Sequence, residues 1–238
     1  MSTHNPIQAY FNWSSGKDSA LALYLALRDP KFQIQTLLTT VNETHQRVSM
    51  HGLRVELLEQ QAEALGLPLE KIWLPETVTM EEYEVLMRAA VDKLKARGLN
   101  DTFFGDIYLE DLRAHREAQL SSVGITAHFP LWQRDTRELL DQLLSLGFKA
   151  VVVAVDGSKL DESFVGRELN ADFIADLPKD VDPCGENGEF HTFVFDGPNF
   201  RHPVPFTLGD TVHRHYQATH LNADHPGFFF KELLPIEA

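Results

Sequence analysis

Apolar residues recur in two periods along the first half of the chain, and these periods predict alternating strands and helices. Residues 7–13 (IQAYFNW) and 32–41 (FQIQTLLTTV) are apolar runs rich in aromatic or β-branched residues, which favours buried strands. Between them, leucines at helical spacing predict a helix from Asp18 to about Arg28, which Pro30 ends. The chain therefore begins as a strand–helix–strand unit.

The same alternation continues to about residue 157. We expect helices at 51–68, 79–97, 109–122 and 136–146, and strands at 70–75, 101–107 and 148–157. Thr79 and Glu82 have the spacing of a capping box, which marks the start of one of these helices. Strands and helices that alternate in this way predict an α/β fold, with a Rossmann-like parallel sheet and helices on both of its faces.

The chain changes character in its second half. From about residue 182 it is rich in proline, glycine and aromatic residues, which favours hairpins and loops. We predict a boundary near residue 127, between an N-terminal domain (1–127) and a smaller C-terminal α+β domain (128–238). The apolar run at 227–234 (GFFFKELL) would then pack in a core or form the contact of a homodimer.

The amino-acid composition and net charge indicate what kind of protein this is. The 238 residues are 43% hydrophobic, which is ordinary for a globular chain. One cysteine, Cys184, excludes an internal disulfide and suits a reducing compartment. We expect a cytoplasmic protein without a membrane segment, because no long apolar run or signal-like start is present. The net charge of -14 makes a nucleic-acid partner unfavourable.

A short Ser-Gly loop, SSGKDS (residues 14–19), stands between the first strand and the first helix. It is not a Walker loop, because Phe11 replaces the first glycine and Asp18 replaces the Ser or Thr. A helix start offers backbone N–H groups to phosphate, so the segment is either a phosphate loop or a capped turn. Asp18 suits a phosphate loop if it binds Mg²⁺, and a capped turn if it caps the helix.

Three polar segments follow predicted strands, and parallel strands bind ligands beyond their carboxyl ends. These segments are SSGKDS, NETHQ (42–46) and GDIYLED (105–111). Because all three are expected at the same edge of the sheet, together they favour a ligand site there more strongly than any one of them does alone.

SSGKDS resembles the S-G-G-K-D-S loop of the PP-loop ATP pyrophosphatases. The segment DPCGENGEFHTFVFDGPNF (182–200) resembles the diphthine–ammonia ligase family, and shorter matches at GDI (105–107), FPLW (129–132) and VGREL (165–169) extend the resemblance over about residues 7–205. Related short chains also occur in bacteria. The resemblance implies an ATP-binding domain at 1–127 and a substrate-side domain at 128–238.

The resemblance also implies an activity. Such enzymes adenylate a carboxylate with ATP and release pyrophosphate, and ammonia or another amine then displaces AMP. In the family the acceptor is the diphthine carboxylate of elongation factor 2.

The same resemblance implies roles for individual residues. The loop around the phosphates of ATP would consist of Ser14, Ser15, Gly16, Lys17, Asp18 and Ser19. The rest of the nucleotide site would be Thr40, Met50, His51, Gly105 and Asp106, with Asp18 and Asp106 binding Mg²⁺. The acceptor side would be Cys184, Gly185, Glu186, Asn187 and Glu189. The catalytic residues would be Lys17, Asp18, Glu186, Glu189 and His191, with a Glu or the His orienting ammonia or taking its proton.

Ser15 departs from the family pattern, which has glycine at this position. If the backbone there requires a positive φ, serine costs about 1 kcal/mol or more.

Other interpretations stay open at this stage. The chain could bind or hydrolyse adenine nucleotides without a diphthine substrate, or it could be a tRNA-modifying PP-loop enzyme, which its acidic charge disfavours. For Cys184, an ordinary loop cysteine is favoured over a sulfur carrier. For His213, His215, His220 and His225, a solvated strand is favoured over a metal site.

Overall fold

The computed structural model describes residues 5–48, 52–215 and 225–236, and it contains two β-sheets. The strands of the first sheet are β1 (Ile7–Asn12), β2 (Phe32–Asn42), β3 (Arg47–Val48), β4 (Leu69–Leu74), β5 (Asp101–Phe103) and β6 (Thr126–His128). β4, β2, β1, β5 and β6 lie side by side in that order and pair in parallel, and β3 pairs antiparallel with the end of β2.

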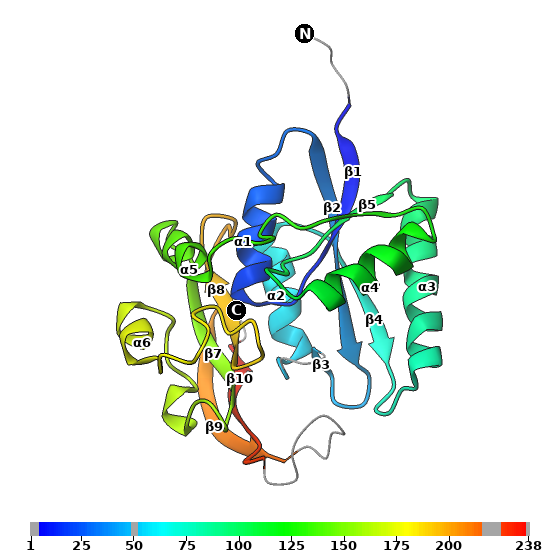
Figure 1. Cartoon of the computed structure of the whole chain (residues 1–238). Coiled ribbons are helices and arrows are strands. Elements are labelled where there is room, and N and C mark those ends of the chain that lie inside the picture. The colour runs from blue at the N-terminus through cyan, green and yellow to red at the C-terminus, as the bar shows by residue number, and fades with distance from the viewer. Residues whose placement is uncertain (1–4, 49–51, 216–224, 237–238) are drawn as a thin grey trace.

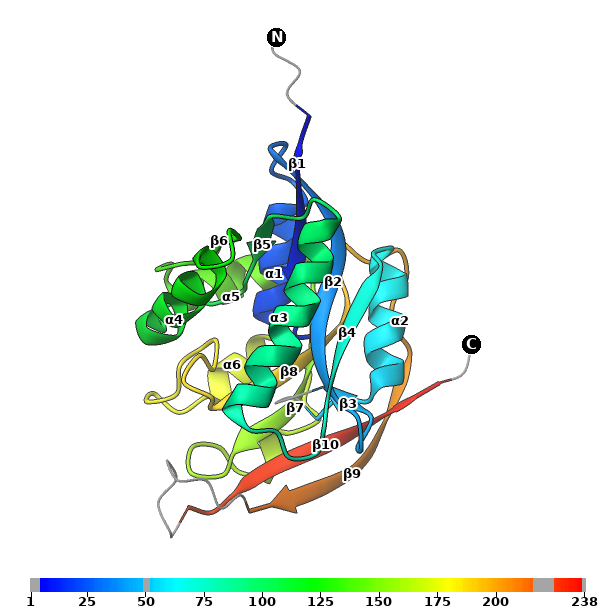
Figure 2. The same ribbon diagram turned by 90° about the vertical axis from the view of Figure 1, so that its right-hand side faces the viewer.

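Helices cover both faces of this first sheet (Figures 1 and 2). They are α1 (Lys17–Ala26) and α2 (Val55–Leu65) on one face, and α3 (Met80–Ala96) and α4 (Glu110–Ser121) on the other. Successive strand residues point to opposite faces: Phe11 and Leu37 pack with α1 and α2, whereas Tyr10 and Leu38 pack with α3. The predicted Rossmann-like parallel sheet is confirmed.

The second sheet is antiparallel, in the order β8-β7-β10-β9. Its strands are β7 (Lys149–Asp156), β8 (Phe190–Asp196), β9 (Phe206–Arg214) and β10 (Phe228–Pro235), and the short helices beside it are α5 (Thr136–Ser145), the 3₁₀ turn η1 (Glu162–Phe164) and α6 (Ala171–Asp176). One hydrophobic core joins α1 and α2 to the inner sides of both sheets. The division into domains at residue 127 stays a prediction.

The apolar run at 227–234 lies within the second sheet. Phe228, Phe229 and Phe230 pair with β7 on one side and with β9 on the other. Sheet formation accounts for this run, and the homodimer stays a prediction.

Two predicted elements differ most from their expected bounds. The helix expected at 51–68 begins only at Val55. The strand expected at 101–107 ends at Phe103, because the chain then passes over the start of α1. At Gly105 a Cβ would lie 2.9 Å from the amide nitrogen of Ser19, so only glycine fits this crossing.

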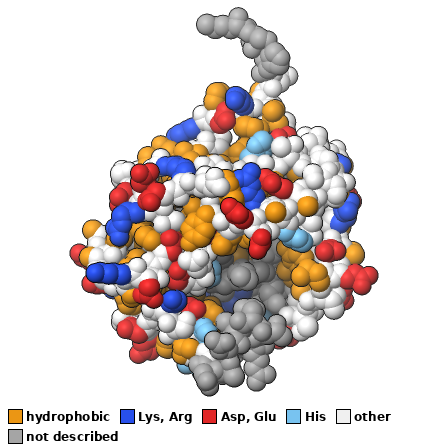
Figure 3. Space-filling view, viewed as in Figure 1, with side chains coloured by type: hydrophobic (Ala, Val, Ile, Leu, Met, Phe, Trp, Pro, Cys, Tyr) orange, Lys and Arg blue, Asp and Glu red, His pale blue; other side chains and the backbone are white. Residues whose placement is uncertain are grey.

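Other local signals agree with the structure. The Thr79 hydroxyl accepts from the Glu82 amide at 3.2 Å, and the Glu82 carboxylate accepts from the Thr79 amide at 2.9 Å, which confirms the capping box. Among the residues that the structure describes, no helix is long and apolar enough to cross a membrane. On the face shown in Figure 3, which is hollowed near its centre, acidic and basic side chains are intermixed.

Candidate active site

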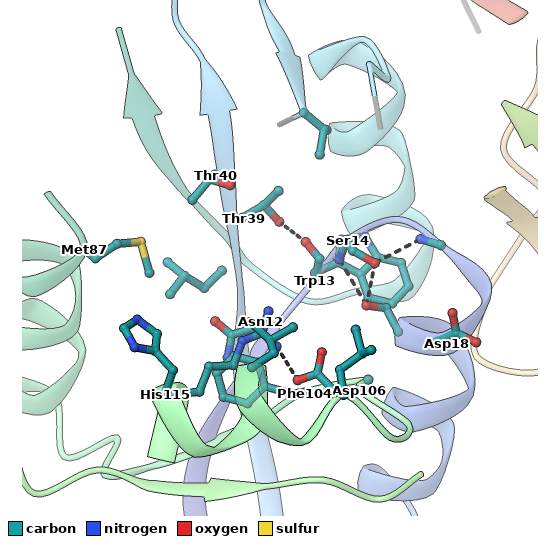
Figure 4. Close-up of a pocket in the computed structure, with 18 of the residues that line it drawn as sticks. Asn12, Trp13, Ser14, Asp18, Thr39, Thr40, Met87, Phe104, Asp106 and His115 are labelled. Atoms are coloured by element: carbon teal, nitrogen blue, oxygen red, sulfur yellow. Dashed lines mark hydrogen bonds and ion pairs between the residues drawn. The ribbon is translucent and has the colours of Figure 1, made fainter. Parts of the chain in front are cut away.

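A cavity of about 950 Å³ opens at the carboxyl ends of β1, β2 and β5. The strand order reverses direction between β1 and β5, which is where open α/β sheets bind ligands. Most residues predicted from the sequence line this cavity: Ser14, Gly16, Lys17, Asp18, Ser19, Thr40, Gly105, Asp106, Cys184, Gly185, Glu186, Asn187 and His191. Figure 4 shows part of this lining. Met50 and His51 lie outside the described residues.

The loop at 14–19 is closed by its own serines. The Ser14 amide donates to the Ser19 hydroxyl at 3.1 Å, and the two hydroxyls are 2.8 Å apart (Figure 4). Gly16 caps α1 with an extended backbone, and the helix begins at Lys17. The helix start therefore faces the cavity with the partial positive charge that favours a bound anion.

Ser15 adopts the left-handed backbone that a glycine would favour, with a φ of 74°. Its side chain is buried, and its hydroxyl has no hydrogen-bond partner among the described residues. Its carbonyl accepts two hydrogen bonds, from the Val194 amide at 3.0 Å and from the Gln61 side chain at 3.1 Å. The backbone at this position does have a positive φ, so the strain expected for a serine there applies.

Lys17 and Asp18 form an ion pair at 2.7 Å at the start of α1. Burial is the largest single effect on the pKa of Lys17 and acts to lower it, but the charge and hydrogen bond of Asp18, together with the other acidic groups nearby, raise the net pKa. Burial raises the pKa of Asp18 in spite of the neighbouring ammonium. The Lys17 ammonium lies 5.3 Å from the ring centre of Phe190, so it is directed to the C-terminal segment.

Asp106 follows β5 and forms an ion pair with Arg116 of α4. Burial raises the pKa of Asp106, and the charge of Arg116 opposes this rise. The guanidinium of Arg116 also lies 4.6 Å from the ring centre of Phe104. In Figure 4 the carboxylates of Asp18 and Asp106 do not point toward each other. Across the described parts of the chain, no three His, Cys, Asp or Glu residues are grouped to hold a metal.

Glu189 lies behind the cavity lining and is 3% exposed. Its carboxylate accepts from the Asp182 amide at 3.1 Å, from the Asn187 amide at 2.9 Å and from the Asn187 side chain at 3.0 Å. These bonds hold the turn that precedes β8. Both carboxylate oxygens are used inside the protein, which favours a structural role over the predicted catalytic one.

Glu186 and His191 have perturbed pKa values within the cavity. Burial raises the pKa of Glu186 to about 7, although its carboxylate accepts from the Ile107 amide at 2.8 Å. Burial, followed by the charge of Lys17, lowers the pKa of His191 to about 4. At neutral pH the glutamate is therefore close to half ionised and the imidazole is neutral. Glu186 is therefore able to exchange a proton with a substrate near neutral pH, whereas the neutral His191 is able to form a hydrogen bond with one.

Cys184 is 2% exposed, and its thiol donates to the Thr136 carbonyl at 3.2 Å. Burial raises the pKa of the thiol, which disfavours the reactive thiolate. These observations favour the interpretation of Cys184 as an ordinary loop cysteine.

Several lining residues were missed by sequence reasoning. Asn12 donates to the Thr102 hydroxyl at 2.7 Å and to the Phe103 carbonyl at 3.1 Å, and the Thr39 hydroxyl donates to the Trp13 carbonyl at 2.8 Å. Both residues lie near strand ends, and this position was a usable signal. The wall formed by α3 and α4, which includes Met87 and His115, gave no comparable signal because its residues read as a solvated face.

The four histidines considered as a metal site lie at the end of β9 and after it in the sequence. The ring of His213 stacks on Phe229 at 4.5 Å, and His225 lies 3.0 Å from Asp156. His220 lies outside the described residues. These contacts belong to the packing of the second sheet.

The chain is similar to several known proteins. A solved structure of a U34-tRNA thiolase, NcsA from Methanococcus maripaludis with its 4Fe–4S cluster, has a TM-score of 0.39 and 15% identity over 60% of this chain and 59% of its own. The diphthine–ammonia ligase of Bos taurus is 25% identical over 138 residues, which are 56% of this chain and 51% of the bovine protein. That of Schizosaccharomyces pombe is 30% identical over 104 residues, which are 42% of this chain and 17% of the relative.

This chain thus spans about half or less of the length of these two relatives. The sequence model of the diphthamide synthase N-terminal domain matches residues 8–127, and the model of the C-terminal domain matches residues 135–218. Together the two matches include most of the chain and confirm the resemblance seen in its two motifs. The chain belongs to the diphthamide synthase family.

Proposed function

We propose that this protein is an ATP-dependent ligase that forms a C–N bond on an adenylated carboxylate. One observation carries the proposal: the SSGKDS loop and the segment from Cys184 to His191 line the same cavity, although they are far apart in the sequence. A protein that only senses nucleotides has little use for Glu186 and His191 beside the phosphate loop. The pKa of Glu186, at about 7, suits proton transfer near neutral pH, and His191, with a pKa of about 4, stays neutral there.

In the proposed first step, a carboxylate oxygen of the acceptor attacks the α-phosphorus of ATP. The bond from this phosphorus to the oxygen that bridges to the β-phosphate breaks, and pyrophosphate leaves. The start of α1 and the Lys17 ammonium favour the developing negative charge. Adenylation is needed because a carboxylate oxygen is a poor leaving group, whereas AMP is a good one.

In the second step, the lone pair of ammonia attacks the carbonyl carbon of the adenylate. The C–N bond forms, and AMP leaves with the electrons of the C–O bond. The nitrogen then carries an excess proton, and we propose that the Glu186 carboxylate accepts it. His191, neutral at this pH, is placed to orient the nitrogen. The relatives named diphthine–ammonia ligase suggest a diphthine carboxylate, as on elongation factor 2, as the acceptor to test first.

Mg²⁺, when bound, would neutralise phosphate charge during the first step. We propose Asp18 and Asp106 as its candidate ligands, because Mg²⁺ prefers oxygen and is often held by one or two carboxylates together with substrate phosphates. In this structure each carboxylate is paired with a cation, Lys17 or Arg116, and Mg²⁺ would have to share or displace that partner.

The products of ATP cleavage test this function. Purified protein with ATP, Mg²⁺, ammonium and a diphthine-containing acceptor should release AMP and pyrophosphate in equal amounts. Release of ADP and phosphate would refute adenylation. ATP binding without turnover in the presence of the acceptor would favour the nucleotide-binding alternative, and tight, salt-dependent tRNA binding would favour the tRNA-modifying one.

Asp18→Ala supplies a residue-level test of the same function. It removes the carboxylate proposed for Mg²⁺ and leaves the Lys17 ammonium without its partner, so ATP turnover should be lost. Asp92→Ala is the matched control, because Asp92 is exposed on α3. Equal turnover in the two variants would remove Asp18 from the site.

A further inference from the structure

The second sheet contacts the phosphate loop directly, through β8. The Lys17 amide donates to the Thr192 hydroxyl at 3.1 Å. Two residues earlier, the Ser15 carbonyl accepts from the Val194 amide at 3.0 Å. Thr192 and Val194 are alternate residues of one strand, so β8 holds the loop at two points.

Gln61 of α2 supplies a third contact to the loop. It is fully buried, and its side-chain amide donates to the Ser15 carbonyl at 3.1 Å and to the Val194 carbonyl at 2.6 Å. Its side-chain oxygen accepts from the Trp13 indole at 3.0 Å. Every polar atom of this side chain is thereby used, which is the arrangement that makes a buried polar group stabilising.

The approach of β8 to the loop is close. A Cβ at Gly16 would lie 3.3 Å from the Thr192 carbonyl oxygen and 3.6 Å from its hydroxyl. Gly16 has an ordinary extended backbone, so the proximity of β8, and not a positive φ, favours glycine at this position.

We infer that Thr192 and Gln61 are positioning residues of the phosphate loop, which hold Lys17 and Ser15 in place from the second sheet and from α2. Thr192 ends the segment CGENGEFHT (184–192), five members of which the resemblance places on the acceptor side: Cys184, Gly185, Glu186, Asn187 and Glu189. The segment therefore has a second task, which is to fix the loop that grips the nucleotide. The nucleotide part of this inference rests on the proposed function, whereas the loop geometry does not.

The first experiment measures ATP binding to the full chain by calorimetry in the presence of Mg²⁺. Thr192→Val keeps the shape of the side chain but removes the acceptor for the Lys17 amide, and we expect about tenfold weaker binding, as for the loss of one hydrogen bond. Thr192→Ser keeps the hydroxyl and should bind within about threefold of the parent chain. Thr207→Val is the control, because Thr207 is exposed on β9.

The second experiment needs no nucleotide and keeps the two proposals separable. Amide hydrogen exchange at Lys17 should be faster in Thr192→Val than in the parent chain, and Thr192→Ser should restore slow exchange. Gln61→Met should speed exchange in the loop likewise, and the thermal midpoint of each variant reports whether it folds. Parent-like exchange at Lys17 in a folded Thr192→Val chain would overturn the inference. If the parent chain fails to bind ATP, the proposed function fails, and the exchange data still decide the positioning role.

Discussion

Replacing Ser15 by glycine should stabilise the protein by about 1 kcal/mol. Ser15 has a φ of 74°, a region that costs an L-residue about 1–2 kcal/mol relative to glycine. Its hydroxyl is buried without a partner among the described residues, and its removal relieves a further penalty of about 1 kcal/mol. Against these gains, glycine loses about 0.5–1 kcal/mol more conformational entropy on folding, and some packing is lost as well.

The measurement is the thermal unfolding midpoint at a fixed scan rate. For a chain of this size, 1 kcal/mol corresponds to a shift of about 2–4 °C. Ser15→Ala separates the two contributions, because it removes the hydroxyl but keeps the Cβ that the left-handed backbone disfavours. Glycine should raise the midpoint above both the parent chain and the alanine variant. A midpoint for Ser15→Gly at or below that of Ser15→Ala would refute the argument from backbone strain.

Three further predictions concern the cavity. Glu186→Gln should abolish the rise in ligase rate with pH that is expected around pH 7, because only the carboxylate form accepts a proton. The pH–rate profiles of the parent chain and the variant measure this effect. An unchanged rise in the variant would exclude Glu186 as the base. Cys184 should react with iodoacetamide at pH 8 far more slowly than it does in urea, because burial raises the pKa of its thiol; equal rates by mass spectrometry would contradict its burial. Gly105→Ala should destabilise the fold by at least about 1 kcal/mol, because the added Cβ meets the Ser19 amide at 2.9 Å; a parent-like midpoint in urea unfolding would show that the crossing over α1 relaxes freely.

The titration of Glu186 also predicts a change in stability with pH. Its pKa is raised from 4.5 to about 7 in the folded chain, so the folded state binds this proton more tightly than the unfolded state. This contribution is fully present below pH 4.5 and is lost as the pH rises toward 7. Glu186→Gln should remove it, so the difference in unfolding free energy between the two chains should vary over this pH window only.

The alternation of strands and helices along the chain could be predicted because each of these segments carries its own hydrophobic period. Strands β1 and β2 are buried runs, and α3 begins at a capping box whose two hydrogen bonds are local. The end of β5 could not be predicted in this way. The run Phe103–Phe104 is apolar on both sides of that end, and the strand stops because Gly105 crosses the start of α1, which is a contact between distant segments.

The site shows the same division between local and distant causes. The SSGKDS loop was visible because phosphate binding needs a particular backbone within a few residues of a helix start. Arg116 was not visible, because its importance comes from Asp106, which lies on another element. Thr192 and Gln61 were missed for the same reason, since neither residue differs locally from an ordinary strand threonine or helix glutamine.

The hydrogen bonds from Gln61 and β8 explain how Ser15 can keep a strained backbone conformation. A non-glycine residue keeps a positive φ only where the surroundings fix its backbone more strongly than strain disfavours it. Here the Ser15 carbonyl accepts hydrogen bonds from both Val194 and Gln61. The amide of Lys17, the first residue of α1, donates to the Thr192 hydroxyl. If these hydrogen bonds hold the loop against the strain at Ser15, the loss of one of them should loosen the loop less when glycine has removed that strain. The effect of Thr192→Val on loop exchange should therefore be smaller in a Ser15→Gly background, and equal effects in both backgrounds would mean that strain and positioning act independently.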